Sequence, residues 1–251
     1  MSFADIQSRA DAGDVQAMFQ VGEAYDNGTE GCKKDVAEAY KWYSKAASTG
    51  AGHPVATRFA AWALCTGTGV AADIDASIKL YKKAATEHKD IKSMSCLGFF
   101  YEKGQGVTAD PKQAFTWYEM AANGGDSVAQ VNLALCYEKG NGVEKDGAKA
   151  FYWFNKASEG GNVNAYINVG VYYEKGEGGV TKDMKTALSW YLKAAELGDA
   201  TAMTIVACCY ENGEGTAVDN EKAAHYYTEG AMKGNSHAKE GLRRMMKANK
   251  V

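Results

Sequence analysis

The feature of this chain that most constrains its fold is an aspartate that returns at nearly constant intervals. The steps between successive members of the series are 38, 37, 36, 37 and 36 residues. After each aspartate, small and large apolar residues stand at offsets of 4, 7–8 and 11–12, which share one face of a helix. An aspartate before a helix accepts hydrogen bonds from the free amides of its first turn. The pattern therefore predicts six helices, which begin after Asp35, Asp73, Asp110, Asp146, Asp183 and Asp219.

A second helix is predicted before each of these six. A small residue stands three residues after each of its expected N-caps, and in six of the seven segments another small residue stands at eight. The glycines that follow the first set of helices fit left-handed helix ends. One amphipathic pair cannot bury its apolar face alone, whereas stacked pairs can, so the chain is predicted to be an all-α array of helix pairs. The expected N-caps of the second set are Asp14, His53, Asp90, Asp126, Asn162, Asp199 and Asn235.

The repeating unit resembles a known family. Its pattern is seen in LGFFYEKGQGVTADPKQAFTWYEMAANG (97–124) and in VGVYYEKGEGGVTKDMKTALSWYLKAAELG (169–198). This pattern closely resembles the Sel-one-like repeat, a relative of the tetratricopeptide repeat, and it recurs six times over almost the whole chain. The resemblance implies an all-α, right-handed α/α superhelical solenoid and an adaptor role.

The repeat boundaries follow from the two sets of caps. We expect a single solenoid domain over residues 1–251, with terminal capping helices at 3–12 and 235–248. The paired aromatic residues of each second helix, such as Trp117 and Tyr118, follow the apolar face and are interpreted as core. The expected repeats are 14–50, 53–88, 90–125, 126–161, 162–198 and 199–234.

Composition and charge limit the classes of partner and the cellular compartment that are expected. The net charge is −3 and the isoelectric point is about 5.9, which does not favour nucleic acid or an anionic membrane. No stretch approaches the roughly 18 apolar residues of a membrane span. The first residues lack the pattern of a signal peptide, so a cytoplasmic location is expected. The six cysteines show no fixed pairing interval, so they are interpreted as small buried side chains rather than as a disulfide framework.

In tetratricopeptide-like solenoids the first helix of each pair lines the concave surface, so the resemblance implies a groove there. Its recurring positions combine apolar residues, a row of carboxylates and two equivalent asparagines. We expect this groove, centred on repeats three to five, to bind an apolar peptide segment that carries Lys or Arg. The alternative is that the apolar residues pack between helices and the glutamates are simply solvated. The expected groove residues are Arg58, Trp62, Phe99, Glu102, Asn132, Leu135, Glu138, Asn168, Val171, Glu174 and Glu211.

The sequence favours a non-catalytic, monomeric scaffold for protein or peptide partners, with no cofactor or metal. Ser236 and Lys239 match the S-x-x-K motif, and β-lactam binding has been linked to some cysteine-rich members of the family. The companion motifs are absent, so hydrolysis or β-lactam binding is kept only as an alternative. A purely structural solenoid is the third hypothesis, although the basic last helix argues against end-to-end stacking.

Overall fold

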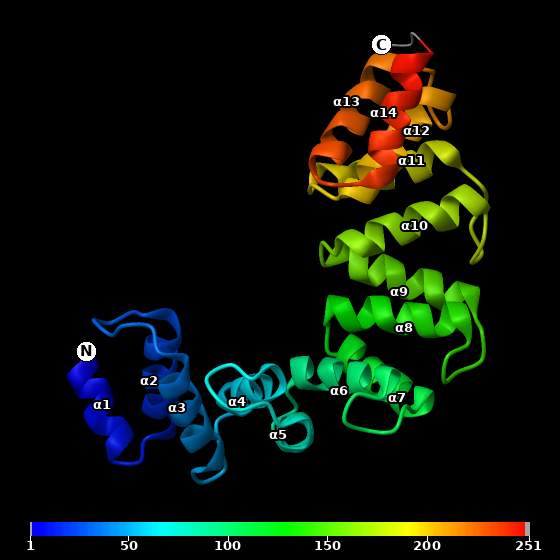
Figure 1. Ribbon diagram of the computed structural model, residues 1–251. Coiled ribbons are helices and arrows are strands. Elements are labelled where there is room, and N and C mark those ends of the chain that lie inside the picture. The colour runs from blue at the N-terminus through cyan, green and yellow to red at the C-terminus, as the bar shows by residue number, and fades with distance from the viewer. Residues whose placement is uncertain (1, 249–251) are drawn as a thin grey trace. The chain divides into compact units, whose positions relative to one another are not determined.

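The computed structural model describes residues 2–248, and within them it contains fourteen α-helices and no strand (Figure 1). Helices α2, α4, α6, α8, α10 and α12 are the first members of the repeats and are called A helices below. Helices α3, α5, α7, α9, α11 and α13 are the second members and are called B helices. The A helices and the terminal helices span α1 (Phe3–Asp11), α2 (Val15–Asn27), α4 (Pro54–Thr66), α6 (Ile91–Lys103), α8 (Ser127–Lys139), α10 (Val163–Lys175), α12 (Ala200–Asn212) and α14 (Ser236–Lys247). The B helices span α3 (Val36–Ser48), α5 (Ile74–Glu87), α7 (Pro111–Asn123), α9 (Gly147–Glu159), α11 (Met184–Glu196) and α13 (Asn220–Met232).

Capping residues begin the helices where the sequence predicted them. The Asp14 side chain accepts a hydrogen bond from the amide of Ala17 at 3.0 Å, and the equivalent contact is made by Nδ1 of His53 at 3.2 Å. All seven predicted A-type caps and all six B-type aspartates are N-caps in the structure. Each cap satisfies an amide that the helix itself leaves without a partner, so these local signals fix where every repeat starts.

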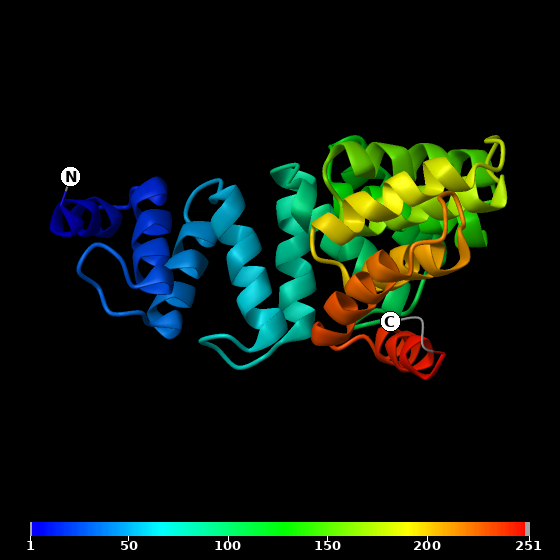
Figure 2. The ribbon, with the colours of Figure 1, turned by 90° about the horizontal axis from the view of Figure 1, so that it is seen from above.

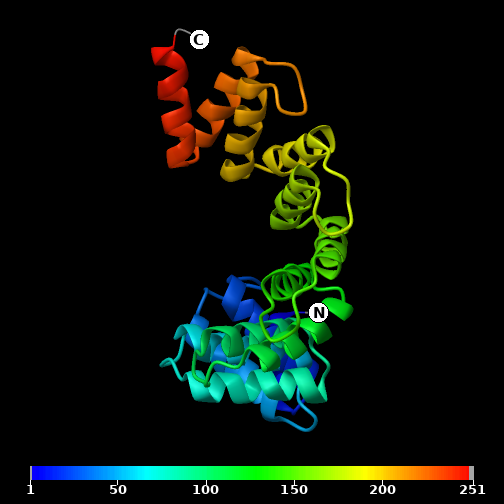
Figure 3. The same cartoon turned by 90° about the vertical axis from the view of Figure 1, so that its right-hand side faces the viewer.

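Packing proceeds from each helix to its neighbours along the chain. Within each of the two compact units described below, an A helix contacts the B helix of its own repeat, and a B helix contacts the A helix that follows it, as α4, α5 and α6 do (Figure 2). The last helix, α14, packs on α13 and also reaches α12 (Figure 3). The contacts group the chain into two compact units that divide after Gly124, with α1–α7 in the first and α8–α14 in the second. The single-domain expectation stays a prediction.

In repeats one, three and five, an aromatic ring of the B helix packs directly against a glycine of the A helix. A Cβ atom at Gly98 would lie 2.5 Å from Cδ1 of Tyr118, so only glycine permits this approach. The sequence interpretation of the paired aromatics is refined by the structure, because the second member is buried in every repeat whereas the tryptophans are only half-buried. The buried rings are those of Tyr43, Tyr81, Tyr118, Phe154, Tyr191 and Tyr227.

Candidate partner-binding surface

The predicted groove residues lie on five A helices. Within the first unit, Arg58 and Trp62 are on α4, and Phe99 and Glu102 are on α6. Trp62 is 46% exposed and Phe99 is 44% exposed, which is unusual for aromatic residues on the same face of neighbouring A helices. The residues in the second unit are Asn132, Leu135 and Glu138 on α8, Asn168, Val171 and Glu174 on α10, and Glu211 on α12.

A recess of about 390 Å³ opens on the A helices of repeats one to three, within the first unit. Phe59, Trp62 and Tyr81 supply its apolar lining. Asp26 adds a negative charge to the lining and Lys92 adds a positive charge. The structure therefore brings Arg58 and Trp62 to one recess, on the N-terminal side of the repeats on which the predicted groove was centred.

Arg58 is held in this recess by contacts within the protein. Its Nε lies 3.3 Å from the carboxylate of Asp90, the N-cap of α6, and its guanidinium lies 5.0 Å from the ring centre of Phe59. Both partners of the ion pair are largely buried, with exposed side-chain fractions of 20% and 13%. Arg58 therefore joins repeats two and three and fixes one wall of the recess, which presents the ring of Trp62 beside a rigid cation.

Sequence reasoning missed a pairing between the carboxylate row and the buried tyrosines. Tyr118 donates to Glu102 at 2.7 Å and Tyr191 donates to Glu174 at 2.5 Å. A longer contact of 3.4 Å joins Tyr43 to Asp26. Burial raises the pKa of Tyr191, and the hydrogen bond to the Glu174 carboxylate raises it further, so this hydroxyl keeps its proton. The carboxylates thus have a structural role, which the solvated-face alternative did not include.

Repeat four shows why the pairing is specific. Its buried ring is Phe154, which has no hydroxyl and so cannot donate a hydrogen bond to Glu138. Tyr172 of the following A helix interacts with Glu138 instead, and after burial the Glu138 charge is the next cause of the raised Tyr172 pKa. The sequence signal was present, since the acid and the ring recur 16 or 17 residues apart.

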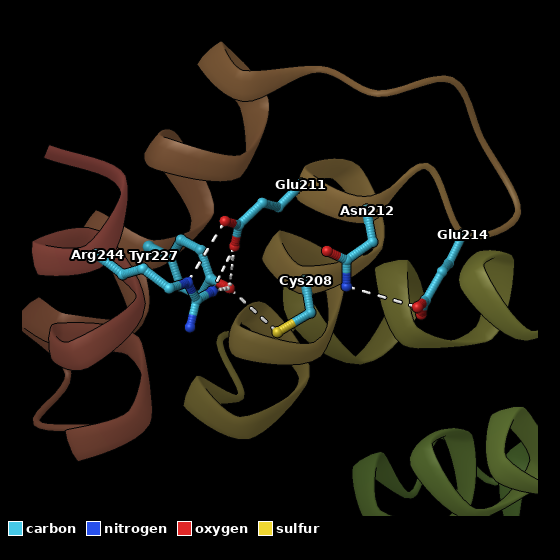
Figure 4. Close-up of polar contacts among 6 residues, drawn as sticks. All are labelled: Cys208, Glu211, Asn212, Glu214, Tyr227 and Arg244. Atoms are coloured by element: carbon cyan, nitrogen blue, oxygen red, sulfur yellow. Dashed lines mark hydrogen bonds and ion pairs between the residues drawn. The ribbon is translucent and has the colours of Figure 1, made fainter. Parts of the chain in front are cut away.

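Glu211 is a correction to the predicted groove. It is only 8% exposed, because its carboxylate accepts hydrogen bonds from the hydroxyl of Tyr227 at 3.0 Å and from the guanidinium of Arg244 at 2.5 Å (Figure 4). Arg244 lies on the terminal helix, nine residues after its N-cap Asn235. Trp62 and Phe99 also stand nine residues after their caps, His53 and Asp90. Arg244 is therefore the last member of the same series of repeat positions.

The two asparagines of the predicted groove, Asn132 and Asn168, are both partly accessible. Both are half-buried on equivalent turns of α8 and α10. The Asn168 amide already donates to the carbonyl oxygen of Asn164 in its own helix at 2.8 Å. Its second N–H and its oxygen remain for a ligand, and the role of the asparagine pair in holding a peptide backbone stays a prediction.

Other chemistry suggested by residue type is not gathered into a site. Within residues 2–248 no group of three or more His, Cys, Asp and Glu side chains is arranged to hold a metal ion. All six cysteines, which lie in the described part, are free, but only Cys136 and Cys209 are buried, so the interpretation of the cysteines as buried side chains is wrong for the other four. Ser236 and Lys239 stand in the first turn of α14, where Ser236 directly follows the N-cap. No helix between residues 2 and 248 has the length and apolar character required to cross a membrane.

Comparison with known proteins fits this architecture. A family model described as Sel1 repeat matches six segments, at residues 15–50, 54–88, 92–126, 127–162, 163–199 and 200–235. The chain belongs to the Sel1 repeat family. Proteins of this family are generally scaffolds for protein interactions.

Two solved structures are similar to this Sel1 repeat protein over most of its length. A protective antigen of uropathogenic Escherichia coli is 28% identical, with a TM-score of 0.91 over 99% of this chain and 52% of that one. A Sel1 repeat protein from Oxalobacter formigenes is 35% identical, with a TM-score of 0.80 over 88% of this chain and 89% of that one. These likenesses support the all-α repeat fold.

The curated relatives are much longer proteins. Chitin synthase regulatory factor 3 of Schizosaccharomyces pombe is 30% identical over 121 residues, which are 48% of this chain and 13% of the relative. Chitin synthase regulator SKT5 of Malassezia restricta is 29% identical over 122 residues, which are 48% of this chain and 8% of the relative. The Sel1 repeat protein thus matches only a small part of each.

Proposed function

We propose that this Sel1 repeat protein is a non-catalytic scaffold that binds a protein or peptide segment through its A-helix surface. The recess lined by Phe59, Trp62 and Tyr81 carries the proposal, because Trp62 is 46% exposed there beside charges of both signs. Large exposed aromatic residues in a concave site with polar neighbours are typical of the anchors that dominate protein interfaces. The names of the two curated relatives, both regulators, support a role in which binding rather than turnover is the activity.

The segment that fits this surface is apolar and carries Lys or Arg. In the first unit, Trp62 and Phe99 offer apolar area on neighbouring A helices and Asp26 offers a carboxylate. In the second unit, Glu138 and Glu174 offer carboxylates on their own A helices. Truncation of a buried interface aromatic to alanine costs on the order of 2 kcal/mol or more of binding free energy. Trp62 and Phe99 are therefore the side chains whose removal is expected to matter most.

The experiment is a quantitative pull-down from native lysate with the wild type and two surface variants. The double substitution Trp62→Ala with Phe99→Ala removes the exposed rings of the A-helix surface. Met120→Ala is the matched control, because Met120 is 42% exposed on a B helix of the same unit. We expect a distinct protein to be captured by the wild type and by the control and to be lost from the double variant. Equal capture by all three proteins, or capture by none, would oppose this assignment of the surface.

A further inference from the structure

The contact of Arg244 shows within this protein how a guanidinium binds a tyrosine–glutamate pair. Nη2 of Arg244 lies 2.5 Å from Oε2 of Glu211 and 3.1 Å from the hydroxyl oxygen of Tyr227 (Figure 4). Tyr227 donates its own proton to Oε2 of Glu211, so its hydroxyl oxygen is free to accept from the arginine. One planar cation therefore binds two acceptors that already hold each other in place.

The same pair stands one repeat earlier, without an equivalent of Arg244. Tyr191 of α11 donates to Oε2 of Glu174 at 2.5 Å, at the same offsets from their caps as Tyr227 and Glu211. The position equivalent to Arg244 is Cys208 on α12, a short neutral side chain whose sulfur contacts the hydroxyl of Tyr227 at 3.1 Å. Among the residues that the structure describes, no lysine, arginine or histidine forms an ion pair with Glu174.

Exposure of the two carboxylates differs as this arrangement requires. Glu211, covered by Arg244, is buried, whereas Glu174 is only half-buried. The Glu174 carboxylate lies on the same helix as Val171 and Asn168, which are also half-buried, so apolar and amide groups stand beside the charge. A carboxylate that is fixed by a buried tyrosine and still reached by solvent is prepared for a ligand at little cost in side-chain entropy.

We propose that the Glu174–Tyr191 pair binds an arginine side chain from a partner protein segment, in the way that Arg244 binds the Glu211–Tyr227 pair. This inference rests on the proposed scaffold function and names the chemistry of one anchor. Arginine fits better than lysine because its flat guanidinium presents several N–H donors in a fixed fork and can reach the carboxylate and the phenol oxygen together. The glutamate of repeat four does not provide the same site, since Phe154 supplies no hydroxyl there.

The test uses the full-length chain and two synthetic probes. Acetyl-Leu-Arg-Leu-amide is titrated against the same peptide with citrulline in place of arginine, which keeps the shape and removes the charge. Binding is followed by backbone amide shifts in NMR spectra. We expect shifts in α10, α11 and α12 with the arginine peptide, and binding of the citrulline peptide to be weaker by about fivefold or more.

Variants at one position then separate the site from non-specific attraction. Cys208→Arg installs an internal arginine where Arg244 stands in the next repeat, so we expect it to occupy the pair and weaken peptide binding by about tenfold. Cys208→Ser is the matched control and should bind as the wild type does. Glu174→Gln keeps an acceptor for Tyr191 but removes the charge, and should weaken binding by about fivefold or more. Unchanged binding in Cys208→Arg, or equal binding of both peptides, would overturn the arginine site.

Failure here is distinguishable from failure of the scaffold function. Loss of captured protein on removal of Trp62 and Phe99 would keep the scaffold even if the arginine peptide binds no better than the citrulline peptide. Equal binding of the two peptides would rule out the Glu174–Tyr191 anchor and nothing else.

Discussion

At the scale of single residues, side chains that are adjacent in sequence can lie in very different surroundings. Cys208 and Cys209 are adjacent on α12, yet Cys208 is half-exposed against Tyr227 whereas Cys209 is 2% exposed in the core. Adjacent residues of a helix point in different directions, so the pair does not act as one redox group. Burial raises the pKa of the Cys209 thiol to about 12.

Cys209 is therefore expected to resist alkylation in the folded protein. At pH 8 a thiol of pKa about 12 is ionised in only about one molecule in ten thousand, and the thiolate is the reactive form. Iodoacetamide labelling followed by peptide mass spectrometry should modify Cys209 only after unfolding in urea. Labelling of Cys209 in the native protein at the rate seen in urea would contradict its burial.

Residue-scale contacts were also the least predictable part of the site. The recurring glutamates and the recurring tyrosines were both visible in the sequence. Whether their side chains form hydrogen bonds depends on how closely an A helix packs on its B helix, which the sequence pattern does not state. The burial of Glu211 depends on Arg244, which is 33 residues away. The recess depends in the same way on the ion pair of Arg58 with Asp90, 32 residues apart, and no local pattern records such contacts.

At the scale of helices, the sequence was sufficient, because caps and apolar periodicity are local. Asp183 illustrates how strongly a cap is defined. Its carboxylate accepts from the hydroxyl of Thr186 at 2.6 Å and from the amides of Lys185 and Thr186. The hydroxyl and amide hydrogen bonds of Thr186 lower the pKa of Asp183 below its ordinary value of 3.8. Because the folded-state pKa is depressed, this cap stabilises the protein above pH 3.8 and its contribution is lost as the pH falls further.

We predict that Asp183→Asn flattens the acid end of the stability profile. Asparagine caps helices about as well as aspartate but does not titrate. Between pH 7 and pH 3, the free energy of unfolding in urea should fall less for this variant than for the wild type. The remaining aspartate caps still titrate, so the variant should keep part of the slope. Identical slopes for the two proteins would show that the Asp183 cap is not linked to pH.

At the scale of the whole chain, stability is a sum over repeats and their neighbours. Leu97 and Leu133 occupy equivalent positions seven residues after the caps of successive A helices, and both are fully buried. They nevertheless belong to different compact units, which divide after Gly124. The pair therefore reports whether the two units respond separately to the loss of core packing.

Leu97→Ala and Leu133→Ala are each expected to lower the free energy of unfolding by about 2–5 kcal/mol, because both leave a cavity in the core. Hydrogen exchange measured by mass spectrometry should then show where the damage extends. We expect faster exchange in α1–α7 for the first variant and in α8–α14 for the second. An even rise in exchange over all helices for either variant would mean that the chain opens as one cooperative unit.

The contact between Arg244 and Glu211 has a consequence for how such a chain can change length. Arg244 reaches back only to the A and B helices of the repeat immediately before it. Duplication or deletion of an internal repeat would therefore leave this closing contact intact, provided that the last repeat and α14 are inherited together. A chain that carries the last repeat together with α14 can therefore gain or lose internal repeats and still form the contact between Arg244 and Glu211.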